Sequence, residues 1–560
     1  VTLANLPVNL IDRVEIYKGV VPASLGTDAL GGAVNIITQA EKKSFMDASY
    51  SIGSFHTHRA NLNAQFMERH TGLVVRPAIG ISYSKNDYRM KDVQMRNETG
   101  DQFIYGNPKR FHDGYFSLLA QIEAGITGKF WADELFVSAS YSKTDKELQT
   151  GSIQTKVYGM AERNSDAWNV SVRYNKYNFM TEGMTLKATL SHTWDHSITI
   201  DTAYRKYYWD GGYIVSQRNE IRGNEPSIRH YKRPLTIVRV NLDYQLDGHH
   251  GLNLNYHMNR TGNDRYDDLD QSFEPSNDAV TKHIIGLTYS QSFFDGKMQN
   301  VFFAKDYVNH PNIRQTDQST VTGSDKVQGS TTKNYFGYGT GLRYMFFDPL
   351  AVKVSYEHSV RLPIARELLG NGTTIYANVA LKPEKSNNVN LALFGTWHPA
   401  GRHTIYYEAN GFLRYVDNYI QTSVIEKEGM MQFVNDPAVH IKGVEGEIRY
   451  DWDGRLQLMA NVSYQDARDQ QKYKEDGKPS ATYDNHVPNR PWLFGNAEAS
   501  YTFHNLLLHD NKLRLGCTFP DMGSLWQPRY QSPYTLTAYL QCQYHLFMET
   551  RQLQHLTGMF

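Results

Sequence analysis

The chain has 560 residues, and its 58 basic and 58 acidic side chains give a formal net charge of zero, which argues against a nucleic-acid-binding surface. It contains no run of about 18 apolar residues, so a transmembrane helix is excluded. The 38 tyrosines, 25 phenylalanines and 42 glycines are typical of many strands whose two faces meet different solvents, as in a transmembrane β-barrel.

The first predicted elements are two short strands that flank a loop of small residues. Val14 and Ile16 alternate with charged and aromatic neighbours, which is the two-residue period of a strand. Val34, Ile36 and Ile37 form a second, β-branched run. Four glycines in and beside the loop permit tight turns or a close backbone approach: Gly19, Gly26, Gly31 and Gly32. Two strands do not make a domain, so the rest of the chain must supply their partners.

Strands of roughly ten residues with alternating apolar and polar side chains repeat from about Phe45 to Phe519. The apolar phase often ends in tyrosine, which is typical of an aromatic girdle at a lipid–water boundary: Tyr141, Tyr244, Tyr256, Tyr356, Tyr450 and Tyr464. A barrel in lipid must close, and bacterial barrels have even strand numbers. From about 20 recognisable candidates, the sequence therefore predicts an all-β fold, a transmembrane antiparallel β-barrel of about 22 strands.

Short turns are expected to alternate with long loops along such a barrel. Tight turns containing Asp and Gly are predicted at residues 247–250, 295–296 and 453–454, on the periplasmic side. Long polar loops, where function is usually located, are predicted at residues 86–110, 145–166, 194–233, 308–333, 360–385 and 466–489. Cys517 and Cys542 have no diagnostic spacing, so a disulfide and two free thiols both fit.

Two regions of the chain resemble a known family. Residues 13–19 and 31–38 resemble the C-terminal end of the plug domain of TonB-dependent outer-membrane receptors, with a Glu-containing strand, a Lys-Gly turn and a Gly-Gly-x-Val-Asn-Ile-Ile-Thr strand in this order. Residues 356–369 and 381–391 resemble a loop and the following strand of the same receptors, in a form similar to that of Bacteroidota. The resemblance therefore extends over nearly the whole chain.

This resemblance implies a domain division and a set of internal contacts. Residues 1–43 would be the C-terminal part of a plug domain, and residues 44–560 the barrel with long extracellular loops. Arg13, Glu15 and Lys18 would then lie on a plug strand inside a polar lumen and form ion pairs with the barrel wall. A signal peptide, the plug segment that contacts TonB and a clean last strand are not recognisable, so a truncated or frame-shifted chain is expected.

The resemblance also implies a function. Such a receptor would take up a scarce ligand across the outer membrane of a Gram-negative cell, foremost a ferric siderophore and otherwise haem, cobalamin or a glycan. Its partners would be the outer-membrane lipid, the ligand, and TonB with ExbB and ExbD, which supply the energy. A passive porin or adhesion barrel, which needs no plug, is the alternative, and a secreted carbohydrate enzyme would need paired carboxylates in a cleft.

No motif for catalysis or for a cofactor is present, so neither is expected. His56 and His58 can share a strand face and bind a metal, and the acidic loop of residues 264–270 can hold calcium through oxygen ligands, although it lacks the EF-hand spacing. Both groups are interpreted as surface residues. One loop combines aromatic rings with cations, which can hold an anionic, ring-bearing ligand by stacking and ion pairing, or contact lipid headgroups instead: Tyr204, Arg205, Tyr207, Trp209, Arg229 and Tyr231.

Overall fold

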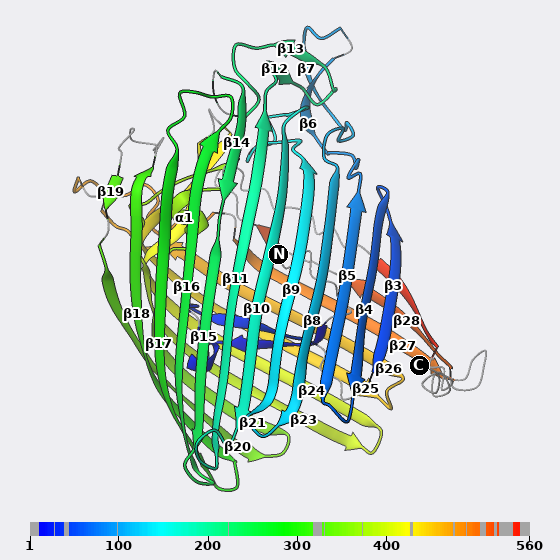
Figure 1. Cartoon of the computed structure of the whole chain (residues 1–560), viewed down its shortest axis with the longest axis vertical. Helices are drawn as coiled ribbons and strands as arrows, with labels where there is room; N and C mark the ends of the chain where they lie inside the picture. The colour runs from blue at the N-terminus through cyan, green and yellow to red at the C-terminus, as the bar shows by residue number, and fades with distance from the viewer. Residues whose placement is uncertain are drawn as a thin grey trace.

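The computed structural model describes residues 11–548 of the chain. Within that range it leaves out positions 27, 39–43, 98, 222, 224, 317–326, 330, 372, 426–428, 474–475, 489, 505–510, 520–523 and 526–540. Long strands surround a lumen, and a short inner sheet lies within it (Figure 1). The sequence shows no clean last strand after residue 519, and most of that part of the chain lies outside the described residues.

The wall of the barrel is one large sheet, built from 24 strand segments in the described part of the chain and antiparallel except where β22 pairs with β25, which confirms the predicted fold class. Strands that follow each other along the chain pair with each other, as in β8 with β9 and β9 with β10. The strands of the wall are β3 (Phe45–Gly53), β4 (Thr57–Glu68), β5 (Leu73–Ser84), β8 (Tyr115–Lys129), β9 (Ala132–Glu147), β10 (Glu162–Tyr177), β11 (Met184–Asp201), β14 (Ser227–Lys232), β15 (Leu235–Gln245), β16 (His250–Asp267), β17 (Ser276–Phe293), β18 (Met298–Thr316), β19 (Val327–Gly329), β20 (Lys333–Phe347), β21 (Leu350–Arg361), β22 (Ile375–Tyr376), β23 (Glu384–Ala400), β24 (His403–Ile425), β25 (Met430–Trp452), β26 (Leu456–Asp469), β27 (Pro491–His504), β28 (Asn511–Phe519), β29 (Ser524–Leu525) and β30 (Gln541–Met548).

The inner segment, residues 11–38, forms a sheet of its own. β1 (Ile11–Lys18) pairs antiparallel with β2 (Gly32–Thr38), and a 3-10 turn, η3 (Ala23–Leu25), lies in the loop between them. Figure 1 shows this sheet in dark blue within the barrel. The two predicted opening strands therefore pair with each other, and their further partners are side chains of the wall.

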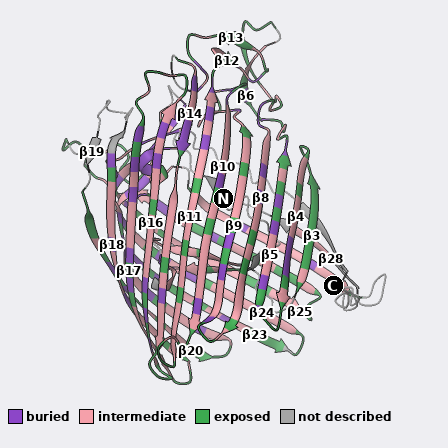
Figure 2. Ribbon diagram, viewed as in Figure 1, coloured by how far each residue is buried: buried purple, intermediate pink, exposed green. Residues whose placement is uncertain are grey.

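The alternation of side chains gives the wall two different faces. On β11, Leu190 and Trp194 are 51 % and 54 % exposed on the outer face, and Thr189 lies on the opposite face. In the lumen, Arg76 of β5 pairs with Glu123 of β8 at 2.6 Å. Most wall residues are partly exposed because one layer of chain borders both lumen and surroundings (Figure 2). An apolar outer face around a polar lumen is the arrangement of a membrane-spanning barrel.

The strands extend further toward the long loops than the sequence predicts. β24 and β25 have 23 residues each, whereas about 9–11 residues suffice to cross a bilayer. Residues 194–201 and 227–232 were predicted to be loop, which is wrong, because isoleucines continue to alternate with polar residues there and the two segments pair as β11 and β14. The predicted turns at 295–296 and 453–454 do join paired strands, and all four residues have positive φ.

Two small sheets stand beyond the barrel at the loop end (Figure 1). β6 (Val93–Arg96) pairs with β7 (Phe103–Gly106), and β12 (Arg205–Tyr207) pairs with β13 (Tyr213–Val215). One buried apolar cluster joins them: Met90, Val93, Val157, Tyr207 and Trp209. A short helix, α1 (Ala365–Leu369), lies in another loop. Among the described residues, no helix is long and apolar enough to cross a membrane.

The two faces of β11 should respond differently to an added charge. We expect Leu190→Arg to lower the free energy of unfolding by about 2–4 kcal/mol, because the outer face of the strand contacts lipid. Thr189→Arg changes the neighbouring residue, whose side chain faces the lumen, and should lower the free energy of unfolding much less. Denaturant unfolding of the protein refolded into phospholipid vesicles measures both. Equal losses for the two variants would contradict this assignment of faces.

Candidate functional site

The three residues that were predicted to join the inner segment to the wall have different partners. Lys18 Nζ lies 3.0 Å from Glu408 Oε1 on β24, so this ion pair connects inner sheet and wall. Arg13 and Glu15 pair with each other at 3.0 Å. Glu15 also accepts hydrogen bonds from Tyr17 and Asn35, and the Tyr17 hydroxyl is the main reason why the pKa of Glu15 is lowered. The hydrogen bonds and the ion pair of Glu15 thus lie within the inner sheet.

A buried ion pair of the wall holds the first turn of the inner loop. Lys305 Nζ on β18 lies 3.0 Å from Glu357 Oε1 on β21 and donates a hydrogen bond of 3.3 Å to the carbonyl oxygen of Val21. The two charged side chains are only 2 % and 1 % exposed. A buried charge is tolerated when it is paired, and this pair also satisfies a backbone carbonyl of the inner segment.

A second lysine of the wall holds the far side of the same loop. Lys282 Nζ on β17 lies 3.2 Å from Asp28 Oδ2 and donates a hydrogen bond of 2.8 Å to the carbonyl oxygen of Leu362. The backbone N–H of Leu362 in turn donates to Asp28 Oδ2 at 3.1 Å. The Asn388 side chain donates to the carbonyl oxygen of Leu30 at 2.7 Å. The loop is therefore bound on both sides to the lumen face.

The predicted glycines occupy the places where the inner segment turns or touches the wall. Gly19 and Gly26 have φ values of +81° and +59°, the left-handed region that favours glycine. A Cβ on Gly31 would lie 2.5 Å from Arg414 Cζ. On Gly32 it would lie 2.7 Å from the carbonyl oxygen of Tyr17, across the inner sheet. Side chains at these positions would separate the segment from its partners.

A cavity of about 410 Å³ lies between the end of the inner loop and the wall. Leu30 lines it from the inner segment, and three arginines line it from the wall and its loops: Arg361, Arg414 and Arg490. Arg361 is neutralised, because its guanidinium lies 2.5 Å from Glu384 and 2.9 Å from Glu367. This cavity, called the arginine cavity below, adjoins the inner segment directly.

The other two arginines of the arginine cavity form no direct ion pair with a described carboxylate, although Glu445 acts on Arg414 at longer range. Arg414 donates a hydrogen bond of 3.2 Å to the carbonyl oxygen of Gly31, and its buried Nε has no hydrogen-bond partner. Arg490 donates to the hydroxyl of Tyr419, which also lines the cavity. Among the described residues, neither arginine forms an ion pair with a carboxylate. Arg414 is partly buried and Arg490 is exposed. Their guanidinium groups are therefore open to a charge-assisted hydrogen bond with an anionic ligand, although Glu367 and Glu384 line the same cavity.

The six residues predicted to bind a ligand belong to two separate sheets. Tyr204 precedes β12, and Arg205 and Tyr207 lie on it. Tyr207 and Trp209 are buried in the cluster that joins the two small sheets, and Trp209 Nε1 donates to the carbonyl oxygen of Gln154 at 3.0 Å. The large apolar surface of the two rings is thus used for packing within the loops.

The remaining two residues of that group lie on the wall. Arg229 of β14 is held by Asp267 at 3.0 Å and by Asp270 at 3.2 Å. Tyr231 is 2 % exposed and has the guanidinium of Arg233 5.2 Å from its ring centroid. A ligand-binding role for the six residues stays a prediction. The acidic stretch here binds arginine, and the described residues contain no group of three or more His, Cys, Asp or Glu side chains that can hold a metal ion.

Sequence reasoning missed the wall residues that touch the inner segment. Lys282, Lys305, Glu357 and Arg414 belong to four strands that are all distant in sequence from the inner segment. Their signal was weak: each is a charged residue in the polar phase of a strand, as are many others. Only the fold selects those that face the inner segment. The arginine cavity could not be predicted from the sequence either, because the residues that line it are spread from Leu30 to Arg490.

Much of the barrel is similar to a known protein family. Residues 149–543 match the family described as TonB dependent receptor-like, beta-barrel. The solved structure of the copper transporter OprC is similar with a TM-score of 0.69 and 13 % identity, over 92 % of this chain and 73 % of that one. At such identity the similarity shows the fold alone.

Two iron-related structures are similar to the same extent. The FrpB iron transporter from Neisseria meningitidis (F3-3 variant) has a TM-score of 0.64 and 15 % identity, over 91 % of this chain and 75 % of that one. The siderophore receptor PiuA from Acinetobacter baumannii has a TM-score of 0.65 and 14 % identity, over 91 % and 76 %. The comparisons do not support the expected Bacteroidota-like form.

The buried pair of Lys305 and Glu357 gives a prediction about stability. We expect Lys305→Met to lower the free energy of unfolding by about 3–5 kcal/mol, because it leaves a buried carboxylate without a counter-charge. The double variant Lys305→Met/Glu357→Gln should recover much of that loss, since no charge then remains. The shift of the denaturant midpoint measures both. A double variant as unstable as the single one would show that lost packing, and not the charge, is responsible.

Proposed function

Because the chain belongs to the TonB dependent receptor-like β-barrel family, we propose that it takes up a scarce anionic ligand, foremost a ferric siderophore, with energy from TonB. The family is non-enzymatic and lies in the outer membrane. We assign residues 1–43 to the C-terminal part of a plug domain and residues 44–560 to the barrel. Haem, cobalamin and a glycan are the other ligands that we consider.

The position of the inner segment is the observation that carries this proposal. A passive porin needs an open lumen, whereas here residues 11–38 are bound to several strands of the wall (Figure 1). Many of these contacts are polar, and water can replace polar contacts at low cost where they are partly exposed. Such an attachment lets a plug stay in place and still shift, which energised uptake requires.

The arginine cavity supports the choice of an anionic ligand. A ligand with carboxylate or catecholate oxygens would supply the direct ionic partner that neither Arg414 nor Arg490 has among the described residues. Arg414 also holds the carbonyl oxygen of Gly31, so the same guanidinium contacts both the cavity and the inner segment. Copper, iron and a siderophore stand in the names of three structurally similar proteins, which favours a metal chelate over a glycan.

The energy for transport would come from outside the barrel. TonB, with ExbB and ExbD, transmits the proton-motive force of the inner membrane and moves or remodels the plug. Lys18 and Glu408 form the most exposed of the contacts described above between the inner sheet and the wall, with side chains 30 % and 20 % exposed. In this mechanism such a contact separates early, and the buried hydrogen bond from Lys305 to the carbonyl oxygen of Val21 separates later.

Growth on a limiting nutrient tests the proposed function. A strain that lacks this gene should grow poorly on one limiting ligand, with ferric siderophores the first choice, and the full-length gene should restore growth. Restoration should disappear in a strain without functional TonB. Growth on limiting haem, cobalamin and a glycan provides the comparison. Restoration that does not depend on TonB would favour a passive channel.

The arginine cavity gives a prediction about affinity. Arg414→Gln or Arg490→Gln should weaken binding of the ligand found in the growth test by about ten-fold, because each removes a charge-assisted hydrogen bond. Arg239→Gln is a matched control, since Arg239 pairs in register with His257, whose side chain contacts Gly26 in the lumen, and does not line the cavity. Titration of the purified chain in detergent measures the affinities. Equal losses in all three variants would contradict a specific role of the cavity.

A further inference from the structure

Two histidines lie side by side on the outer face of the wall, near the loop ends of β11 and β14. His196 Nε2 lies 2.9 Å from His230 Nδ1, and the two nitrogens share a hydrogen bond. On the far side of His230, its Nε2 lies 2.9 Å from Asp268 Oδ2. On the far side of His196, its Nδ1 lies 4.0 Å from Asp166 Oδ1. The four side chains thus form one row from β10 to the end of β16, called the histidine row below.

The histidine row lies on the loop side of an aromatic belt. Trp168 and Trp194 are register partners on β10 and β11, and both are more than half exposed. Exposed tryptophans on a barrel mark the boundary between lipid and water. Asp166 and His196 are the next register pair on the same face, toward the long loops. Protons from the solvent can therefore reach the row.

The shared hydrogen bond limits how many protons the row can hold. A carboxylate accepts hydrogen bonds, so His230 donates from Nε2 to Asp268 and its Nδ1 is an acceptor. His196 must then donate from Nε2, and its Nδ1 carries no proton while the ring is neutral. A first added proton can bind to His196 Nδ1, opposite Asp166. A second would have to bind to His230 Nδ1, where it meets the N–H of His196 and breaks the bond.

The surroundings of the row favour the state with few protons. Burial is the main reason why the pKa of His196 is lowered, although Asp166 attracts its proton. His230 and Lys232 lower this pKa further. Because it lies below the value of about 6.5 of an unfolded histidine, the stabilisation by His196 is present at neutral pH and is lost as the pH falls. The ring of Tyr266 stacks on His230. Further charged groups on these strands and on β9 are Lys143, Asp195 and Asp264.

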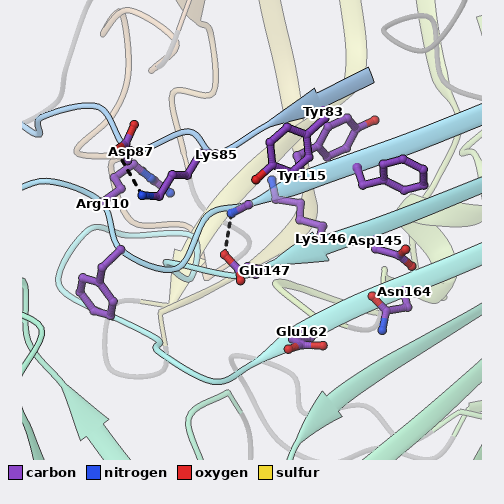
Figure 3. A pocket seen from close by; sticks show the side chains of 13 residues that line it. Tyr83, Lys85, Asp87, Arg110, Tyr115, Asp145, Lys146, Glu147, Glu162 and Asn164 are labelled. Carbon is purple, nitrogen blue, oxygen red and sulfur yellow. Dashed lines mark hydrogen bonds and ion pairs between the residues drawn. The ribbon is translucent and has the colours of Figure 1, made fainter. Parts of the chain in front are cut away.

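A pocket of about 420 Å³ lies beside the row but is separate from it. Glu162 and Asn164 are the next residues of β10 on the outer face, toward the loops, and they line this pocket together with Lys146 (Figure 3). Its carboxylates also titrate in acid: Asp87, Asp145, Glu147 and Glu162. A test of the histidine row must separate its response from theirs, and substitution of a single histidine does so.

We propose that the histidine row is a pH-sensitive fastener, which holds the loop ends of β11 and β14 together and opens when both histidines are protonated. Residues 196–201 of β11 pair with residues 227–232 of β14. The chain between them carries β12 and β13 and four of the six residues predicted to bind a ligand. Two adjacent imidazolium ions repel each other, so acid loosens the attachment of this loop. The fastener acts whichever ligand passes through the lumen.

Hydrogen exchange of backbone amides tests the proposal. The full chain is purified in detergent, and exchange of residues 227–232 is measured at about pH 7.5 and about pH 5, on either side of the ordinary histidine pKa. Each rate is divided by the exchange rate of an unfolded peptide at the same pH. We expect protection in the wild type to fall by about ten-fold or more in acid, which corresponds to a pKa difference of about one unit between the closed and open forms.

Two histidine variants of the same strand separate the row from other titrating groups. His196→Gln should remove the pH dependence, because the glutamine amide can donate to His230 Nδ1 or, when that nitrogen is protonated, accept from it. His192→Gln is the matched control, since His192 lies on the same face of β11 and bonds Thr236 outside the row. This variant should keep the response of the wild type.

The protonation steps themselves provide a second measurement. NMR of the chain with carbon-13-labelled histidine rings follows both residues, whose signals are identified by His196→Gln and His230→Gln. Because the two rings share one proton site, their steps should be separated by about one pH unit or more. Coincident steps would overturn the proposal. So would protection in the wild type that does not change with pH, or a pH response that survives in His196→Gln or disappears in His192→Gln.

Discussion

The rest of the structure depends on one constraint, which is that no backbone polar group of the wall can remain unpaired in lipid. Closing the sheet meets this constraint, and it forces side chains to alternate between lipid and lumen along every strand. Leu190 and Thr189 are adjacent in the chain but lie in different solvents. A polar lumen follows from the closure itself, and that lumen allows a separate polar segment to be held inside.

The attachment of the inner segment is graded from one end to the other. Lys18 and Glu408 form a partly exposed pair, which is worth little in free energy because water competes for both charges. Lys305 and Glu357 form a buried pair that also binds the carbonyl oxygen of Val21. Contacts of such different strength suit a body that must be retained between events and released in an ordered way. An apolar contact adds to these polar ones, because Leu30 packs against a buried cluster that includes Val416 and Val439 of the wall.

Much of the fold could be predicted from sequence, because alternation is local and a strand reveals its period within a few residues. The glycines of the inner loop were also recognisable, since positive φ at Gly19 and Gly26 restricts residue choice. Contacts across the lumen were not recognisable, because Val21 and Lys305 lie 284 positions apart and no local pattern connects them. The packing of Trp209 between loops was not recognisable either, because the sequence shows only an aromatic residue beside cations and suggested a ligand for its ring.

Arg414 of the wall closely contacts Gly31 of the inner segment, so the residue at position 31 and the arginine constrain each other. The guanidinium occupies the space where any other residue at position 31 would place its Cβ. A larger residue at position 31 would displace this flexible guanidinium, and with it the hydrogen bond to the carbonyl oxygen of residue 31. Because the same guanidinium lines the arginine cavity, an inner segment from a related barrel with a larger residue here would alter the cavity of its new host.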